Sequence, residues 1–248
     1  MNTYPDKITW HATLEASKDE YQLLTKNNIK KIKKALKELS ESPYQFKVEK
    51  VTSAYINKFI PKYKEHIALM KHPRDVHSEK FLRSHTLKKN TYHAISLYKK
   101  TELIGSFIFN VKQKSITSTY RFFPKKISIK LSASPSYIAE SIFIKEALAK
   151  KVGTVWHGKD TNPYGINSAI GLAQYKLANG YTPVVSRHAE KFKKITTVKP
   201  KEDTLVLLGN KILEPITSAI LYTNTPENYT DITKSKKISV TVKPYKKE

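Results

Sequence analysis

Most of the information about the fold lies in one stretch, residues 136–185, which reads SYIAESIFIKEALAKKVGTVWHGKDTNPYGINSAIGLAQYKLANGYTPVV. It predicts a largely buried helix that begins after Ser134-Pro135, because serine is a favoured helix N-cap and proline a favoured first helical residue. Three further elements are expected after this helix, in chain order: a strand over 153–157, a helix over 165–179 that ends at Gly180, and a strand over 181–186.

Upstream of that stretch, the sequence alternates helical patterns with short apolar runs. The expected elements are, in order, a helix over 18–39, a strand over 44–51, a helix over 52–69 that is kinked or restarted at Pro61, a short helix near 78–88, and strands over 92–98, 103–111 and 115–123. Short polar turns join the last three strands, which is typical of an antiparallel meander. The run over 127–131 is either a fourth strand or an extended crossing, and a later strand is expected over 203–208.

Together these elements predict an α/β (α+β) fold. An antiparallel meander is followed by a βαβαβ-like closing unit in one mixed sheet, with helices on both faces. The 248 residues, 39% of them hydrophobic, are enough for a proper core. We expect a single domain over 1–205 and a C-terminal β-rich extension or tail over 206–248. In such sheets ligands bind where neighbouring strands diverge.

The charge balance indicates a polyanionic partner. Lys and Arg number 45 against 21 Asp and Glu, a net charge of +24, and such a field attracts RNA, DNA or an anionic membrane surface. Nucleotide bias in the source is the alternative explanation. Five lysines of the helix predicted over 18–39 fall within an arc of roughly 100°: Lys26, Lys30, Lys33, Lys34 and Lys37. This row is either a solvated face or a phosphate-binding stripe.

Several classes of function find no support in the sequence. There are no cysteines for disulfides, thiolate metal sites or a cysteine nucleophile, and no P-loop of an NTPase. The segment HPRDVH, 72–77, holds two histidines and an aspartate without a clear third ligand, so no metal site is expected. Neither a signal peptide nor a transmembrane run is visible, so we expect a cytoplasmic location.

The densest polar cluster is HGKDTNPYG, 157–165. Asp160 or His157 can serve as general base for an attacking amine, and Lys159 and Asn162 can hold a substrate. The alternative is an ordinary turn, because Asp, Asn, Pro and Gly all favour turns. On the last meander strand, Tyr120 and Arg121 are neighbours, and only one of them can face a cleft because strand side chains alternate. The next helix carries Glu140, either a base or a capping residue.

The order of elements resembles the Gcn5-related N-acyltransferase (GNAT) fold, and in detail its FemAB-like branch of aminoacyl-tRNA-dependent transferases. The resemblance covers about residues 20–187. Three stretches support it: the basic helix, strand and helix of 23–67, the strand pair YHAISLYKKTELIGSFIFNV (92–111), and the closing unit 136–185. Relatives have an aromatic–lysine pair, matched here by Tyr175-Lys176, before a glycine-ended helix. The resemblance implies that Lys176 points toward the acyl-transfer cleft, where a lysine can stabilise an oxyanion; otherwise Lys176 only complements the helix dipole.

One departure from the family pattern concerns the acyl donor. Acetyl-CoA enzymes of this fold use a Gln/Arg-x-x-Gly-x-Gly/Ala loop whose amides cradle the pyrophosphate. The matching segment FFPKKISIKLSASPSYIAE, 122–140, contains no glycine. The resemblance therefore implies transfer of an aminoacyl group from aminoacyl-tRNA, as a co-substrate rather than a bound cofactor, to an amine acceptor. That acceptor is a peptide, a peptidoglycan precursor or a small natural product. Two alternatives stay open: a CoA-dependent N-acyltransferase with an atypical donor loop, and a non-enzymatic RNA- or DNA-binding protein.

Overall fold

The computed structural model describes residues 2–70, 79–87, 91–124 and 127–245. The chain divides into two compact units. The central unit comprises residues 13–155, and the terminal unit comprises residues 1–12 together with 156–248. The sequence predicted a domain boundary at 205/206, a position that falls inside strand β10 (Thr204–Leu208) of the terminal unit.

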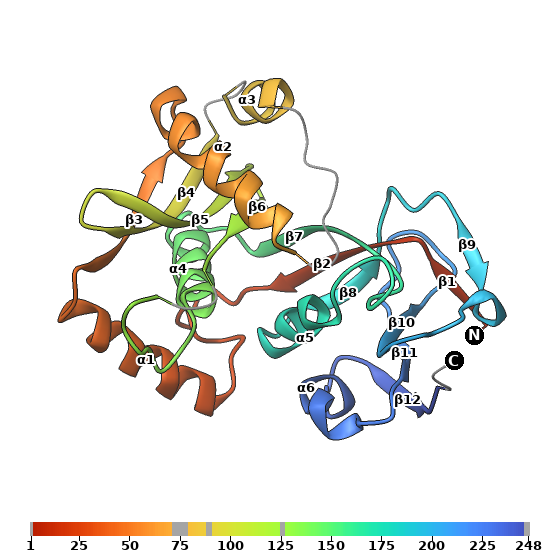
Figure 1. The fold of residues 1–248 in the computed structure, drawn as a ribbon. Helices are drawn as coiled ribbons and strands as arrows, with labels where there is room; N and C mark the ends of the chain where they lie inside the picture. The colour runs from red at the N-terminus through yellow and green to blue at the C-terminus, as the bar shows by residue number, and fades with distance from the viewer. Residues whose placement is uncertain (1, 71–78, 88–90, 125–126, 246–248) are drawn as a thin grey trace. The chain divides into compact units, whose positions relative to one another are not determined.

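The central unit is built on the predicted meander, seen as neighbouring strands in Figure 1. Its four strands pair in chain order, each antiparallel to the next: β3 (Tyr44–Lys50), β4 (Tyr92–Lys99), β5 (Glu102–Val111) and β6 (Ser115–Phe122). Each lies within two residues of its predicted bounds. The register of β4 and β5 shifts between Leu97 and Tyr98, and that of β5 and β6 between Ile108 and Phe109.

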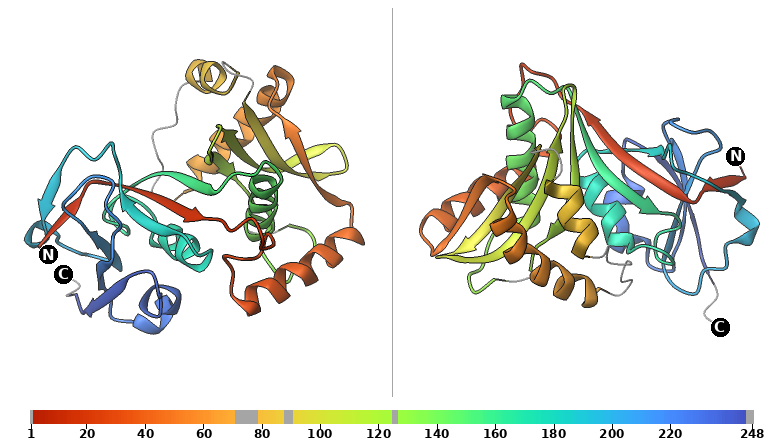
Figure 2. Two further views of the ribbon diagram at one scale, coloured as in Figure 1. Left: turned by 180° about the vertical axis from the view of Figure 1, so that it is seen from behind. Right: turned by 90° about the horizontal axis from the view of Figure 1, so that it is seen from above.

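Two helices cover opposite faces of this meander (Figure 2). On one face lies α2 (Ser53–Ala68), where Phe59 packs on Tyr120 and Phe122 of β6 with ring centroids 6.5 and 5.5 Å apart. On the other lies α4 (Pro135–Ala149), where Phe143 packs 4.8 Å from Phe107 of β5. Because successive strand residues point to opposite faces, β5 and β6 supply side chains to the contacts with both helices. The unit also contains α1 (Lys26–Ser40) and α3 (Glu79–Leu87).

The structure corrects one sequence prediction for the central unit and excludes one alternative in each of two others. The first helix begins at Lys26 rather than at 18, because the Thr25 hydroxyl caps it by accepting the Asn28 amide. α2 runs through Pro61 as one helix instead of restarting there. Residues 127–131 form no strand. There the Ser128 side chain and backbone amide both pair with the Tyr44 hydroxyl instead of with a neighbouring strand.

The described residues of the terminal unit form three groups of strands. β7 (Thr154–Thr161), β2 (Lys7–Thr13) and β8 (Thr182–Val185) lie in that order, and β2 and β8 are antiparallel. β1 (Thr3–Pro5) pairs with β9 (Phe192–Lys194). β10 pairs antiparallel with β11 (Ser218–Tyr222), which pairs parallel with β12 (Ser239–Lys243). Its helices are α5 (Ile170–Ala178), the short α6 (Thr230–Thr233) and two 3-10 turns, Ile195–Thr197 and Pro226–Tyr229.

Two bounds in the terminal unit change the interpretation of the polar cluster. β7 extends to Thr161, so all of HGKDT, 157–161, lies on a strand, which excludes the alternative of an ordinary turn for these five residues. α5 begins at Ile170, five residues later than expected, because residues 163–168 form a tight turn in which Gly165 donates its amide to the Ser168 carbonyl. Within the described ranges, no helix is long and apolar enough to span a bilayer.

Candidate functional site

A buried ion pair lies inside the terminal unit. Nζ of Lys176 on α5 lies 2.5 Å from Oδ2 of Asp160 on β7. The two side chains are 4% and 2% exposed. The sequence placed both residues among its catalytic candidates, and the structure brings them into direct contact.

Two aromatic side chains complete this cluster, and both donate to the same carboxylate oxygen. Trp10 of β2 donates its indole Nε1–H to Asp160 Oδ2 at 2.9 Å, and Tyr164 donates its hydroxyl to the same oxygen at 2.8 Å. The Lys176 ammonium also lies 5.6 Å from the Trp10 ring centroid, within cation–π range. Trp10 and Tyr164 are fully buried. We call these four residues, Trp10, Asp160, Tyr164 and Lys176, the buried cluster.

Two glycines allow the backbone to place the cluster. Gly180 has φ 76° and follows α5. The Tyr181 amide donates to the Lys176 carbonyl and the Gly180 amide to the Leu177 carbonyl, which is the Schellman arrangement at a helix end. The predicted glycine cap is therefore confirmed. Gly165 has φ +94°, and a Cβ there would lie 2.1 Å from the Asp203 carbonyl oxygen.

The pairing explains how two charges are kept inside the unit. An isolated buried charge is costly, and the attraction between two of them offsets that cost only when further hydrogen bonds are present. Here the carboxylate accepts from an ammonium, an indole and a phenol. The Lys176 ammonium is thus held in one position beside β7. In this conformation the pair is closed to solvent.

The other predicted residues of the terminal unit have different surroundings. His157 is 3% exposed and packs edge to face on Tyr181, with centroids 4.3 Å apart. Asn162 is 2% exposed, and its amide bonds the backbone of Pro5 and Leu207, which joins three segments of chain. Lys159 is exposed, and Tyr175 is half-buried.

Tyr120 and Arg121 of the central unit point to opposite faces of β6. Arg121 donates to Glu140 of α4 at 3.1 Å, and its guanidinium lies 4.2 Å from the Phe107 ring centroid. Glu140 is 2% exposed, so its carboxylate is committed to this pair. Tyr120 faces α2 instead. Burial, together with the neighbouring Tyr92 and Tyr63, raises the pKa of its phenol above the ordinary value.

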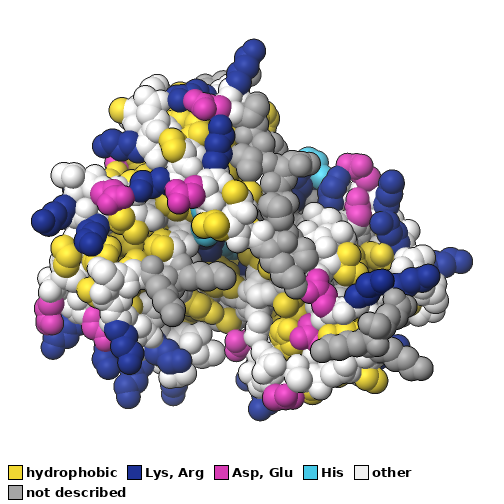
Figure 3. Space-filling model, viewed as in Figure 1, with side chains coloured by type: hydrophobic (Ala, Val, Ile, Leu, Met, Phe, Trp, Pro, Cys, Tyr) yellow, Lys and Arg dark blue, Asp and Glu magenta, His cyan; other side chains and the backbone are white. Residues whose placement is uncertain are grey.

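The lysine row of α1 lies on the surface. Lys26, Lys30, Lys33, Lys34 and Lys37 are all exposed, as is Lys31, while Ile32, Ala35 and Leu39 are buried on the opposite side. Figure 3 shows basic side chains gathered where α1 lies in Figure 1. The contacts of the row include Lys34 at 4.0 Å from Glu38 and Lys33 at 5.2 Å from the Tyr21 ring centroid.

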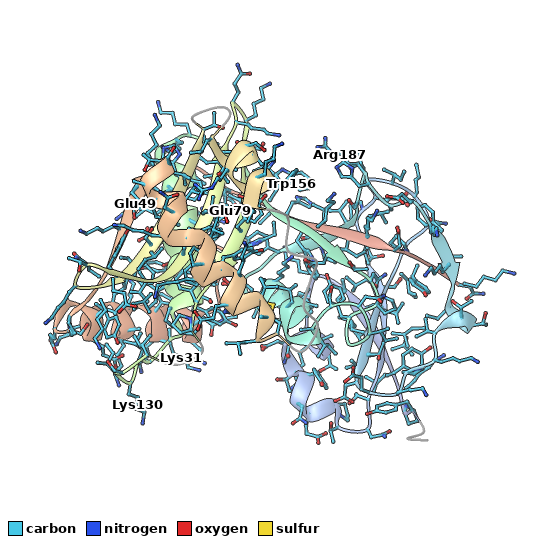
Figure 4. All side chains as sticks on the ribbon, turned by 45° about the horizontal axis from the view of Figure 1, so that its top comes forward. Lys31, Glu49, Glu79, Lys130, Trp156 and Arg187 are labelled. Carbon is cyan, nitrogen blue, oxygen red and sulfur yellow. The ribbon has the colours of Figure 1, made fainter. Side chains whose placement is uncertain are left out.

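A shallow pocket of about 460 Å³ lies in front of α4, lined by residues 127–131 and 133–135. Glu38 of α1 reaches this loop, accepting from the Ser132 amide and the Ser132 hydroxyl at 2.7 Å each. These two bonds, with Ser132 as the largest cause, lower the pKa of the Glu38 carboxyl. In Figure 4, Lys130 of the loop and Lys31 of α1 both point outward. The loop therefore leads into the N-terminus of α4, and one of the loop's backbone amides already donates to a carboxylate.

No group of three or more metal-ligating side chains occurs among the described residues. The histidine pair of HPRDVH lies outside them. Sequence reasoning missed Trp10 and Tyr164. Tyr164 stood within the quoted polar cluster, four residues after Asp160, but Trp10 is 150 positions from Asp160 and carried no local signal.

No protein-family model matches the sequence, and no curated protein matches it either. Solved structures do. A conserved protein of unknown function from Bacteroides thetaiotaomicron is 10% identical with a TM-score of 0.51, covering 71% of this chain and 56% of that one. L-PGS from Bacillus licheniformis is 14% identical, TM-score 0.40, covering 71% and 52%. A tandem GNAT protein from the clavulanic acid biosynthesis pathway is 8% identical, TM-score 0.42, covering 72% and 50%.

At these identities the likeness concerns the fold alone, and of these three the Bacteroides protein has the one TM-score above 0.5. The chain spans about half the length of the solved structures it matches. The predicted mixed α/β fold, with an antiparallel meander and helices on both of its faces, is confirmed.

Proposed function

We propose that this chain is a GNAT-like acyltransferase that moves an aminoacyl group from aminoacyl-tRNA to an amine acceptor. The observation that supports the tRNA donor is the exposed lysine row of α1. Lys30, Lys33, Lys34 and Lys37 recur at the spacing of one helix face, and all four are exposed. A row of ammonium groups follows a phosphate backbone and gains affinity by releasing counterions.

The loop before α4 supports tRNA over CoA. A pyrophosphate bound there would need free backbone amides at the helix N-terminus. The Ser132 amide instead donates to the Glu38 carboxylate, which would repel a phosphate. Residues 122–140 contain no glycine, so the loop lacks the backbone freedom that a nest of amides requires.

A CoA donor is the second candidate, favoured by the pocket itself. Its volume of about 460 Å³ lies directly in front of α4, beside Lys130 and Ser134. The Ser134 side chain makes no capping hydrogen bond to the helix, so its hydroxyl can turn toward a ligand. Displacement of Glu38 would then be the first step of CoA binding.

The chemistry that we assign to the buried cluster is positioning and charge stabilisation. An aminoacyl ester is already activated, so orientation and a preorganised charge can lower much of the barrier. In this proposal the Lys176 ammonium stabilises the developing oxyanion, and Asp160 fixes its position. His157 remains a predicted base of the terminal unit, and Arg121, Tyr120, Lys159, Asn162 and Tyr175 remain predicted substrate contacts.

The test of the donor is binding of charged tRNA, uncharged tRNA and acetyl-CoA, each repeated across salt concentration. We expect tRNA to bind with a steep salt dependence, and the slope to flatten by ~0.7–0.9 for each phosphate that a variant no longer neutralises. The triple variant Lys30→Glu, Lys33→Glu and Lys34→Glu should flatten it. The matched control reverses three exposed lysines elsewhere in the central unit: Lys58, Lys112 and Lys114.

Binding of acetyl-CoA without a preference for tRNA over other polyanions would contradict the tRNA donor and favour the CoA enzyme. Tight tRNA binding without transfer to any amine would instead favour the third candidate, a non-enzymatic RNA-binding protein. In that case the Lys176→Met variant should bind tRNA as the wild type does.

A further inference from the structure

The sheet of β10, β11 and β12 in the terminal unit (Figure 1) has one covered edge and one open edge. At the covered edge, Tyr164 and Leu205 of β10 exchange backbone hydrogen bonds. The Asn162 side chain bonds the backbone of Leu207 on the same strand. β12 forms the opposite edge, and among the described residues its backbone pairs with β11 alone. Every residue of β12 except Val240 is exposed, so the outer side of this strand is open to a further strand.

The pairing with β11 determines which backbone groups of β12 point outward. Ser239 donates its amide to the Thr217 carbonyl. In a parallel pair, alternate residues of a strand bond to the same neighbour, so the odd-numbered residues of β12 face β11. Val240 and Val242 therefore point their N–H and C=O groups away from the sheet. These are the groups to which an added strand would bond.

β12 lacks the side chains that usually protect an open edge. Native edge strands are protected by charged residues, by proline or by their shortness. β3, at the edge of the meander, carries Lys47, Glu49 and Lys50 among its seven residues. β9 has only three residues, and two of them are lysines. β12 reads SVTVK, with three β-branched residues and no charge before Lys243, so its edge favours pairing with another strand.

The charges around this edge indicate which kind of strand it attracts. From residue 232 to residue 245 the chain contains lysines but no acidic residue. These lysines are all exposed, and no ion pair joins them to another described residue: Lys234, Lys236, Lys237 and Lys243. A second copy of this chain would bring the same lysines against the edge, and each copy carries a net charge of +24. Self-pairing is therefore disfavoured, and an acidic strand is attracted.

We infer that the outer edge of β12 binds an acidic protein segment in an extended conformation, which adds to the sheet as a further strand. The main chain of this segment bonds to Val240 and Val242. Its side chains alternate between the two faces of the sheet, beside these valines on one face and beside Thr241 and Lys243 on the other. The favoured segment therefore alternates apolar and acidic residues. The inference does not depend on aminoacyl transfer.

The test measures the fluorescence anisotropy of labelled peptides with blocked ends at physiological salt, where long-range attraction between exposed charges is screened. We expect the peptide Glu-Val-Glu-Val-Glu-Val-Glu to bind. The peptide Glu-Pro-Glu-Pro-Glu-Pro-Glu keeps the charge but cannot form a regular ladder, so it should bind more weakly by ~10-fold or more. The peptide Lys-Val-Lys-Val-Lys-Val-Lys keeps the strand pattern, and like charges should weaken its binding by ~10-fold or more.

A variant of the protein tests the edge directly. Val242→Pro removes an outward N–H and leaves the bonds to β11 in place, so the acidic peptide should bind by ~10-fold more weakly. The matched control is Val48→Pro on β3, because Val48 and Val242 are each 42% exposed. The N–H of Val48 also points outward, since Val51 donates to the Tyr92 carbonyl and the register of β3 with β4 is unbroken. The control should bind the acidic peptide as the wild type does.

A second variant tests the charge. Lys237→Glu combined with Lys243→Glu keeps the backbone of the edge, and it should weaken binding of the acidic peptide by ~10-fold and strengthen binding of the lysine peptide. Melting temperatures show whether each variant is folded. If Val242→Pro unfolds, the charge variant and the proline peptide still decide the outcome.

Several results would overturn the inference. The wild type could bind none of the peptides, or it could bind the proline peptide as well as the valine peptide, which would indicate attraction by charge alone. Equal binding of the lysine peptide would exclude an acidic partner. Equal weakening by Val48→Pro and Val242→Pro would show that the edge of β12 is not the site. A dimer in sedimentation that Val242→Pro dissociates would assign the edge to a second copy of this chain instead.

Discussion

Nζ of Lys176 lies 2.5 Å from Oδ2 of Asp160 inside the terminal unit, and the same oxygen accepts from Trp10 and Tyr164. A lysine near a helix end would ordinarily extend into solvent beside the last carbonyl groups. Here it points inward and neutralises a strand carboxylate. The pair therefore has a structural role, and an experiment on catalysis by Lys176 must distinguish the two roles.

The first prediction separates these two roles by charge removal. Lys176→Met or Asp160→Asn alone leaves an uncompensated buried charge and should cost about 3–5 kcal/mol of unfolding free energy. The double variant removes both charges and should recover most of that stability. Urea unfolding measures the three values. If Lys176 acts on the substrate, the double variant should be folded but inactive. Recovered activity in the double variant would show that the pair has only a structural role.

The second prediction concerns the Tyr164 hydroxyl. Tyr164→Phe keeps the ring and removes one donor to Asp160, so it should lower the unfolding free energy by about 1–3 kcal/mol. Tyr222→Phe is the matched control, because its hydroxyl makes no hydrogen bond to any of the described residues. Chemical denaturation compares the two. A smaller loss for Tyr164 than for Tyr222 would show that the hydroxyl contributes nothing to the cluster.

The third prediction concerns acid sensitivity at Glu38. Its hydrogen bonds from Ser132 lower the pKa of the carboxyl in the folded state. A lowered folded pKa gives stability that is present above the unfolded value of about 4.3 and is lost as pH falls through the folded value. The difference in melting temperature between wild type and Glu38→Gln should therefore shrink as pH falls below ~4. A difference that is constant with pH would contradict the bonds to Ser132.

The fourth prediction compares two glycines of the terminal unit. Gly165→Ala should destabilise strongly, because its φ is +94° and the new Cβ would meet the Asp203 carbonyl at 2.1 Å. Gly171→Ala should be neutral or stabilise by about 0.4–1 kcal/mol, since nothing lies within 4 Å of its Cβ position on α5. Thermal melts of the two variants should shift in opposite directions, and equal shifts would contradict the turn at 163–168.

The parts of the fold that local patterns determine could be predicted from the sequence. The meander follows from alternation over 92–123, and the start of α4 and the end of α5 follow from Ser134-Pro135 and Gly180. The first helix was extended too far, because the acid-rich segment before Thr25 was taken into the helical pattern. The strand predicted over 153–157 was too short, because the residues that follow His157 are of types that favour turns, although here they continue β7.

The candidate site was predictable in part. Asp160 and Lys176 were singled out separately, and their contact depends on how α5 packs beside β7, which no local pattern specifies. Trp10 lies on β2, the strand that pairs with β8. Its contact with Asp160 joins residues 150 positions apart in the sequence.

The most direct measurement of the proposed function follows a labelled aminoacyl group on tRNA in a single turnover with a primary amine. We predict that the protein moves the label into an amide faster than the amine reacts alone, and that the α1 charge-reversal variant loses this acceleration at physiological salt. Release of the label at the uncatalysed rate, with tRNA demonstrably bound, would contradict the proposed aminoacyl transfer.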